Sequence, residues 1–213
     1  MSDIREQVKE YYSKMSIDNG GEMATHTCSC GTDSLPRYIR DVLAEIPEEI
    51  TSRFYGCGSP LPPALEGCTV LDLGCGTGRD VYLASKLVGP EGKVIGVDMN
   101  SDQLSFAKSH QAEMAAKFYD NVEFVESYIE DLSAISDGSV DVVISNCVIN
   151  LSPMKEQVFK EIWRVLKIGG ELYFSDVFCD RRMSDELRAD PVLRGECLGG
   201  AMYIDDFRRM LAK

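Results

Sequence analysis

The sequence predicts an α/β fold in which helices flank a sheet of parallel strands. From residue 68 onward, short runs of β-branched and apolar residues alternate with segments of helical periodicity. A glycine-rich turn joins the first of these runs to the first helical segment. Strand, helix and strand at this spacing form right-handed crossovers, so the strands are expected to be parallel. The 213 residues, 44% of them hydrophobic, are enough to fill one sizeable core.

Residues 1–67 are predicted to form a helical cap ahead of the sheet. Apolar residues recur every three or four positions over 3–15, which predicts a helix. Residues 16–34 are polar and glycine-rich and predict a mobile loop. Helical spacing resumes over 35–46, where Ser34 is a candidate N-cap and a proline occupies the first turn.

The α/β domain is expected to occupy residues 68–213 and to contain five strands. The predicted strands are 69–74, 93–99, 122–127, 140–146 and 171–178. The predicted helices are 78–88, 101–118 with Ser101 as its cap, and 153–167.

The glycine-rich turn "VLDLGCGTGRD" predicts a nucleoside-binding site. Gly74, Gly76 and Gly78 follow the first strand and open a helix, where glycine lets the backbone turn tightly and approach a ligand. Asp98 ends the second strand, where a carboxylate can accept hydrogen bonds from both ribose hydroxyls. The G-x-G-x-G spacing differs from the nicotinamide fingerprint, and Asp72 lies beside the turn. A carboxylate there repels a diphosphate and suits a cation, so the electrostatics favour S-adenosylmethionine over NAD.

Two later segments agree with this cofactor. "ESYIEDL" follows the third strand, where Glu130 can reach the adenine amino group and Ile129 can pack on the ring. Core packing is an equally good explanation of Ile129. Asn146 closes the fourth strand, at the carboxyl edge where open α/β sheets bind ligands.

The composition excludes several classes of partner. Acidic residues outnumber basic ones, 35 to 22, and the formal charge of −13 opposes both nucleic acid and anionic lipid. No apolar run is long enough to cross a bilayer, and the first residues lack a secretory signal, so we expect a cytoplasmic protein. In a reducing compartment the eight cysteines should be free thiols, metal ligands or redox-active groups.

The cysteines divide into two groups. Cys57, Cys147 and Cys197 lie in glycine-flanked segments or at the cofactor edge, on segments that can converge, and the loop around residues 28–30 can close over them. We expect structural roles for the remaining cysteines. These are Cys68, Cys75 and Cys179. Burial alone is the likelier explanation of Cys147 taken by itself. Zinc is the other alternative, and "HTCSC" supplies one histidine and two thiols, but paired C-x-x-C ligands are missing.

The residues that carry these features resemble the arsenite methyltransferases, which methylate trivalent arsenic with S-adenosylmethionine. The matching segments cover nearly the whole chain. They are "VKEYY", "PRYIRDVL", "RFYGCG", "VLDLGCGTGRD", "GVDM", "YIEDL", "SNCVINL", "ELYFSDV" and "GECLGGA". The glycine turn fits any class I methyltransferase, whereas "RFYGCG", "SNCVINL" and "GECLGGA" are specific in combination. The resemblance implies a Rossmann-like class I methyltransferase sheet.

The resemblance also implies roles for the matching residues. Cys147 and Cys197 would bind As(III), and Cys57 with an N-terminal thiol would complete the thiolate site and act as reducing partners. Cys28 fits that N-terminal position best by its separation from Cys57, and Cys30 remains open. Tyr55 would lie by the sulfonium. The residues implied to hold the cofactor are Gly74, Asp98, Met99, Gln103, Ile129, Glu130 and Asn146. The implied partners are arsenite and a dithiol reductant such as thioredoxin or glutathione.

The match differs at the C-terminal end. The family normally continues with two further strands and a C-terminal region, so we expect the strand 171–178 to be an exposed sheet edge. Such an edge would pair with another chain, bind a missing segment or aggregate. Two alternatives therefore stay open beside a complete enzyme. The first is a non-catalytic paralogue that binds arsenite, the cofactor or both, and the second is a methyltransferase for another small acceptor.

Overall fold

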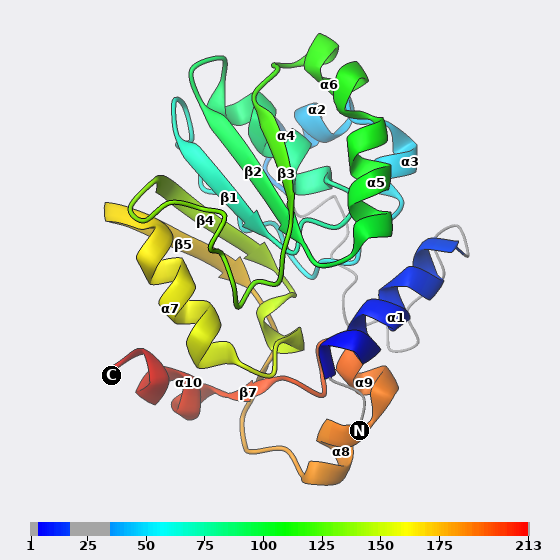
Figure 1. The fold of residues 1–213 in the computed structure, drawn as a ribbon, viewed down its shortest axis with the longest axis vertical. Helices are drawn as coiled ribbons and strands as arrows, with labels where there is room; N and C mark the ends of the chain where they lie inside the picture. The colour runs from blue at the N-terminus through cyan, green and yellow to red at the C-terminus, as the bar shows by residue number, and fades with distance from the viewer. Residues whose placement is uncertain (1–3, 18–34, 213) are drawn as a thin grey trace.

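The centre of the molecule is a five-stranded parallel sheet with the strand order β3-β2-β1-β4-β5 (Figure 1). The computed structural model describes residues 4–17 and 35–212. The strands are β1 (Thr69–Leu73), β2 (Lys93–Asp98), β3 (Val122–Glu126), β4 (Val140–Asn146) and β5 (Leu166–Ser175). The predicted parallel sheet is therefore confirmed. The chain builds outward from β1 to β3 and then crosses back to β4, so the strand order reverses between β1 and β4, where open α/β sheets bind ligands.

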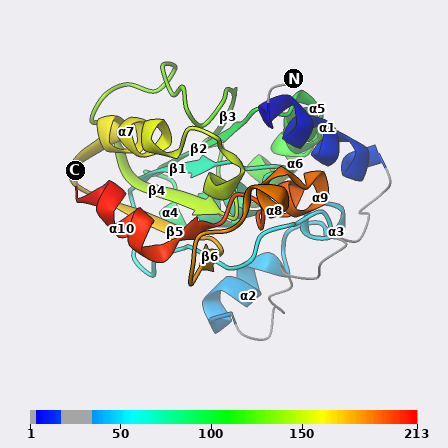
Figure 2. The same ribbon diagram turned by 90° about the horizontal axis from the view of Figure 1, so that it is seen from below.

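Both faces of the sheet are covered because the strand residues alternate between two hydrophobic clusters. Val70 packs with α4 (Arg79–Val88) on one face, whereas Leu71 and Leu73 pack with α7 (Lys155–Val165) on the other. Figure 2 shows α7 on one side of the sheet and α2 (Arg37–Leu43) on the opposite side. All five residues of β1 except Thr69 are buried, as expected for a central strand.

The described part of the segment ahead of the sheet is helical up to residue 51, with short connections, and irregular over 52–68. It contains α1 (Ile4–Ile17), α2 and α3 (Glu48–Thr51). Ile39, Val42 and Ile50 are buried in the same cluster as the β1 side chain Val70. The capping position of α2 is Pro36, and the predicted cap Ser34 lies outside the described residues. A domain boundary at residue 67 stays a prediction.

The predicted helix over 101–118 is wrong in one respect, because it is broken at His110 into α5 (Ser101–Ser109) and α6 (Gln111–Lys117). Ser109 Oγ donates to the carbonyl oxygen of Phe106, and His110 Nδ1 lies 3.1 Å from the same oxygen. Such side-chain bonds compete with the helical ladder. The cap is Asn100 rather than Ser101, since Asn100 Oδ1 accepts from the backbone N–H groups of residues 102 and 103.

The last predicted strand also differs from the observed one. β5 begins at Leu166, because residues 167–170 bulge between two stretches that pair with β4, and Gly169 there has φ of +84°. The strand ends at Ser175, and β6 (Phe178–Cys179) pairs instead with β7 (Met202–Tyr203). Within the described residues β5 pairs only with β4, which places it at the sheet edge.

Short helices precede and follow β7 along the chain. They are α8 (Asp185–Ala189), α9 (Pro191–Gly195) and α10 (Ile204–Leu211). Figure 1 shows α1 and α9 side by side beyond the carboxyl ends of the strands, and the two helices are in contact. The predicted site residues that the structure describes lie at or near this end of the sheet. No helix in the described residues is both long and apolar enough to span a bilayer.

Candidate active site

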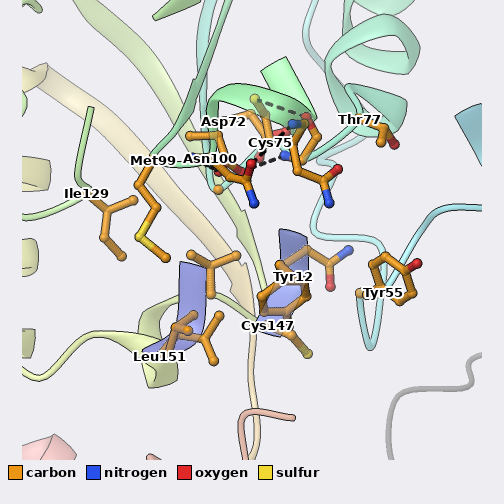
Figure 3. Close-up of a pocket in the computed structure, with 18 of the residues that line it drawn as sticks. Tyr12, Tyr55, Asp72, Cys75, Thr77, Met99, Asn100, Ile129, Cys147 and Leu151 are labelled. Atoms are coloured by element: carbon orange, nitrogen blue, oxygen red, sulfur yellow. Dashed lines mark hydrogen bonds between the residues drawn. The ribbon is translucent and has the colours of Figure 1, made fainter. Parts of the chain in front are cut away.

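A pocket opens at the carboxyl ends of β1, β2 and β4, at the point where the strand order reverses (Figure 3). Ten of the residues predicted to hold the cofactor line it. These are Tyr55, Asp72, Gly74, Gly76, Asp98, Met99, Gln103, Ile129, Glu130 and Asn146. Cys147 lines the same pocket. Their roles in binding stay predictions, but the fold gathers them around one cavity.

Gly78 is the predicted cofactor residue that does not line the pocket. It caps α4 with φ of +87°, and a Cβ there would lie 3.2 Å from both Tyr82 and Phe124. Its glycine therefore serves the turn and the packing under α4. Gly74 has φ of +72°, and a Cβ there would overlap the Val148 side chain. Gly76, with φ of +53°, faces the open pocket.

The floor of the pocket is acidic. Asp72 and Asp80 are both buried and line the pocket with Asp98. Burial, together with the charges of Asp80 and Asp98, raises the pKa of Asp72 well above its ordinary value. Arg79 forms an ion pair with Asp80 at 2.8 Å and stacks on the ring of Phe54. A cationic ligand on this floor would relieve the repulsion among the carboxylates.

Asp98 is held in place by the backbone. Its Oδ2 accepts from the N–H of Gly76 at 2.8 Å, and its Oδ1 accepts from the N–H of Asn100 at 2.8 Å. Burial raises the pKa of Asp98, and these N–H groups oppose that rise. Each carboxylate oxygen has a further lone pair, so the group can still accept two hydroxyl donors, as a ribose diol requires.

The far end of the pocket is formed by the segment after β3. The Glu130 carboxylate is buried, and its Oε1 accepts a 2.5 Å hydrogen bond from Ser152 Oγ. Ile129 is also buried, and its side chain belongs to the α7 cluster as well as to the pocket wall. Ile129 therefore packs in the core and faces the cavity at once.

Asn146 connects the fourth strand to the turn around Cys57. Its Nδ2 donates to the carbonyl oxygen of Gly58 at 2.7 Å and to Asp80 Oδ2 at 3.2 Å, and its Oδ1 accepts from the N–H of Gly58. A Cβ on Gly56 would lie 2.6 Å from the Asn146 side chain. The amide therefore fixes the "YGCG" turn beside β4.

Three of the predicted arsenic-binding cysteines are brought together. Cys57 and Cys147 are joined by a disulfide with their Cα atoms 5.9 Å apart. The Cys197 thiol donates to the carbonyl oxygen of Cys147 at 2.6 Å. Cys147 and Cys197 are both buried, and they have φ of +58° and +66°.

The described residues hold no group of three His, Cys, Asp or Glu side chains arranged for a metal ion. With Cys57 bonded to Cys147, the three sulfurs do not form a trigonal ligand set in this state of the protein. Cys28, Cys30 and the "HTCSC" zinc alternative lie outside the described residues.

The three cysteines predicted to be structural occupy different surroundings. Cys75 is buried and lines the pocket, where burial, followed by the charges of Asp98 and Asp72, raises the pKa of its thiol. Cys68 precedes β1 and also has a raised pKa because of burial. The Cys179 thiol lies 4.0 Å from the carbonyl oxygen of Ala201. Raised pKa values leave the first two thiols protonated and poor nucleophiles.

The sequence did not identify the part of the pocket wall that α1 provides. Residues Arg5, Val8, Lys9 and Tyr12 line the cavity, together with Asn100 of the β2–α5 turn. Helical spacing predicted that one face of α1 is buried, but spacing does not say against which element. The available signal in the sequence was the recurrence of apolar residues along this helix, and the structure shows that one of them, Val8, is buried.

The parallel sheet reverses its strand order beside a glycine-rich turn, and an acid lies at the end of the second strand. These features define the class I S-adenosylmethionine-dependent methyltransferase fold. The model of a methyltransferase-domain family matches residues 64–213, and the chain belongs to that family.

The chain is similar to proteins that methylate arsenic. An arsenite methyltransferase from Aquipseudomonas alcaligenes is 50% identical over 97% of this chain, and one from Homo sapiens is 44% identical over 95%. The matches cover 60% and 55% of those two proteins, so the chain spans little more than half of their length. A solved arsenic(III) S-adenosylmethionine methyltransferase from Chlamydomonas reinhardtii has a TM-score of 0.80 and 49% identity, over 84% of this chain and 62% of its own.

Proposed function

We propose that this protein transfers the methyl group of S-adenosylmethionine to trivalent arsenic held by cysteine sulfurs, in arsenic detoxification. The observation that carries this proposal is that Cys57 and Cys197, from two other segments, both contact Cys147, which lines the pocket. Thiolates are soft ligands and suit a thiophilic centre such as As(III). The similarity to arsenite methyltransferases supports the same substrate.

The pocket suits S-adenosylmethionine along its whole length. The ammonium and sulfonium groups would lie over the acidic floor, which Asp72 and Asp80 dominate. The ribose hydroxyls would donate to Asp98, whose orientation two backbone N–H groups fix. Adenine would lie between Ile129 and Glu130. Tyr55 lines the pocket and would lie by the sulfonium.

The methyl transfer needs no general base. Arsenic bound by sulfur keeps a lone pair, which attacks the methyl carbon while the carbon–sulfur bond of the cofactor breaks and its electrons stay on the departing thioether. No proton leaves the nucleophile. The protein therefore contributes orientation and a dry site.

The transfer formally oxidises arsenic by two electrons, so the thiols must return two electrons. A pair of thiolates can do this by forming a disulfide, and Cys57 and Cys147 are close enough to be that pair. An external dithiol, such as thioredoxin, or glutathione would then reduce the disulfide before the next arsenite binds. Cys28, or Cys30 in its place, would supply a further thiol.

The test is to incubate the reduced chain with arsenite, methyl-labelled S-adenosylmethionine and a dithiol, and to measure label in arsenic species. We expect labelled methylarsenicals from the wild type and from Cys179→Ser, a matched cysteine variant outside the pocket, and none from Cys197→Ser. Arsenite that binds without any transfer of label would instead indicate a non-catalytic binding protein. Label from Cys197→Ser at the wild-type rate would refute the thiolate site.

A further inference from the structure

Two adjacent tyrosines of α1 contact the residues directly before Cys197. Tyr11 donates from its hydroxyl to Glu196 Oε1 at 2.9 Å, although 185 positions separate the two residues. Tyr12 donates from its hydroxyl to the carbonyl oxygen of Gly195 at 3.0 Å. Figures 1 and 2 show α1 beside α9, the helix that ends at Gly195. The two hydroxyls therefore hold the segment that presents the Cys197 thiol, Tyr11 through the Glu196 side chain and Tyr12 through the Gly195 backbone.

The contact is close, and its Gly195–Glu196 side is buried. A Cβ on Gly195 would lie 2.8 Å from Cγ and Cδ1 of Tyr11, so the ring lies directly on the glycine backbone. Glu196 has no exposed surface, and a buried carboxylate is costly unless it is hydrogen-bonded. The Tyr11 hydroxyl supplies such a bond. Burial, together with the bond to Glu196, raises the pKa of Tyr11 to about 12, so it remains a donor at neutral pH.

The same helix forms part of the cofactor pocket. Tyr12 lines the cavity, and its ring centroid lies 6.0 Å from that of Tyr55 (Figure 3). Ser13 Oγ accepts from Asn100 Nδ2 at 3.1 Å, which ties α1 to the turn beside Asp98. One helix thus contacts both the cofactor side and the thiol side of the site.

We propose that Tyr11 and Tyr12 are positioning residues, which fix the Gly195–Glu196 segment so that the Cys197 sulfur stays beside Cys147 at the edge of the methyl-transfer pocket. This inference rests on the proposed function and adds α1 to the acceptor side of the reaction. Neither hydroxyl needs to touch arsenic. Each hydrogen bond restricts the motion of the Gly195–Glu196 segment, which must hold the Cys197 sulfur in a fixed position relative to the cofactor.

The experiment uses Tyr11→Phe, Tyr12→Phe and the double variant of the full chain, after reduction of its disulfide. Tyr173→Phe is the matched control, because the Tyr173 hydroxyl also donates to a glutamate, Glu171, at 2.9 Å but on the exposed surface. Peptide-resolved alkylation by iodoacetamide measures the accessibility of Cys197. Equilibrium dialysis measures arsenite binding, and calorimetry with S-adenosylhomocysteine measures the cofactor site.

We expect the Cys197 alkylation rate to rise about tenfold and arsenite affinity to fall about tenfold in each tyrosine variant, because each loses a bond that closes the segment. In Tyr11→Phe, whose ring lies outside the cofactor pocket, S-adenosylhomocysteine affinity should stay within about twofold. Tyr173→Phe should leave the alkylation rate unchanged. If the double variant fails to fold, as judged by its thermal transition, the single variants decide.

Unchanged alkylation and unchanged arsenite affinity in both single variants would overturn the proposal. Equal loss of arsenite and cofactor affinity in Tyr11→Phe would also overturn it, because that result means a general loosening of the site. A wild-type chain that binds no arsenite would refute the proposed function instead. The alkylation rates would still decide whether the two tyrosines position Cys197.

Discussion

Gly200→Ala should separate the two thiol-bearing segments without touching either thiol. A Cβ on Gly200 would lie 1.8 Å from the carbonyl oxygen of Asn150 and 2.8 Å from its carbon. Asn150 lies three residues after Cys147, and Gly200 lies three residues after Cys197. The substitution therefore acts on the contact that keeps these segments together.

The Asn150 backbone, with which the new Cβ would clash, is held by several hydrogen bonds. The Asn150 carbonyl accepts from Lys155 Nζ at 3.0 Å, and its N–H donates to Asp176 Oδ2 at 3.0 Å. The Asn150 side chain donates to the carbonyl oxygen of Val177. Relief of the clash to 3.0 Å demands a movement of about 1.2 Å, which the Gly200 segment must make.

A displacement of this size predicts a loss of on the order of 100-fold in kcat/KM for arsenite, since about 1 Å at a reacting site costs that much. The assay is transfer of labelled methyl groups to arsenic, with S-adenosylhomocysteine affinity expected to stay within about threefold because the cofactor wall is untouched. Stability should fall by about 1–3 kcal/mol from overpacking.

Gly138→Ala is the control. Its φ is +57° and nothing lies near its Cβ, so the variant is destabilised by backbone strain of about 1 kcal/mol at a site remote from the pocket. Gly200→Ala with a kcat/KM close to that of Gly138→Ala would refute the role of this contact in positioning the thiols.

Three further predictions concern the cofactor, the thiols and pH. Asp98→Ala should weaken S-adenosylhomocysteine binding at least tenfold in calorimetry and leave arsenite affinity roughly intact; unchanged affinity would contradict the ribose assignment. Cys147→Ser and Cys197→Ser should each abolish arsenite binding in dialysis while the cofactor still binds, and normal arsenite affinity in both would contradict the thiolate site. Burial raises the pKa of Asp176 to about 6, so the folded state holds a proton that the unfolded state releases near pH 4. The stability contributed by Asp176 is therefore present below about pH 4 and is lost as pH rises through 6, and Asp176→Asn should lack this loss. Denaturant unfolding at pH 4.5 and 7.5 should show the wild type losing about 2 kcal/mol relative to the variant, once partial exposure is allowed for, and parallel pH profiles would refute the shift.

Sequence reasoning succeeded where local chemistry decides the structure. The glycine-rich turn follows a buried strand. The acids and the amide near the strand ends were predicted, from their positions alone, to lie at the ligand-binding edge of the sheet. Parallel strands end at one edge, so Asp72, Asp98 and Asn146 had to meet there once the alternation of strands and helices was recognised. The residues that line the pocket from the sheet were predictable for this reason.

Sequence reasoning failed where competing or distant contacts decide the structure. The break at His110 depends on side-chain bonds to the Phe106 carbonyl, which helical periodicity does not reveal. The bulge at the start of β5 depends on its register with β4. The bond of Tyr11 to Glu196 joins opposite ends of the chain, so spacing within α1 gave no sign of it.

The backbone conformation of Cys147 supports the proposed thiolate site over burial alone. Among the described residues, Cys147 and Cys197 are the non-glycine residues with positive φ. This conformation costs on the order of 1–3 kcal/mol for a residue with a Cβ, and glycine would avoid most of that cost. A small core residue with no other role has no reason to keep a thiol at such a position. Cys147 lines the acidic pocket, and the strained Cys197 donates to its carbonyl oxygen. The proposed requirement for sulfur at these two points explains this pair better than packing does.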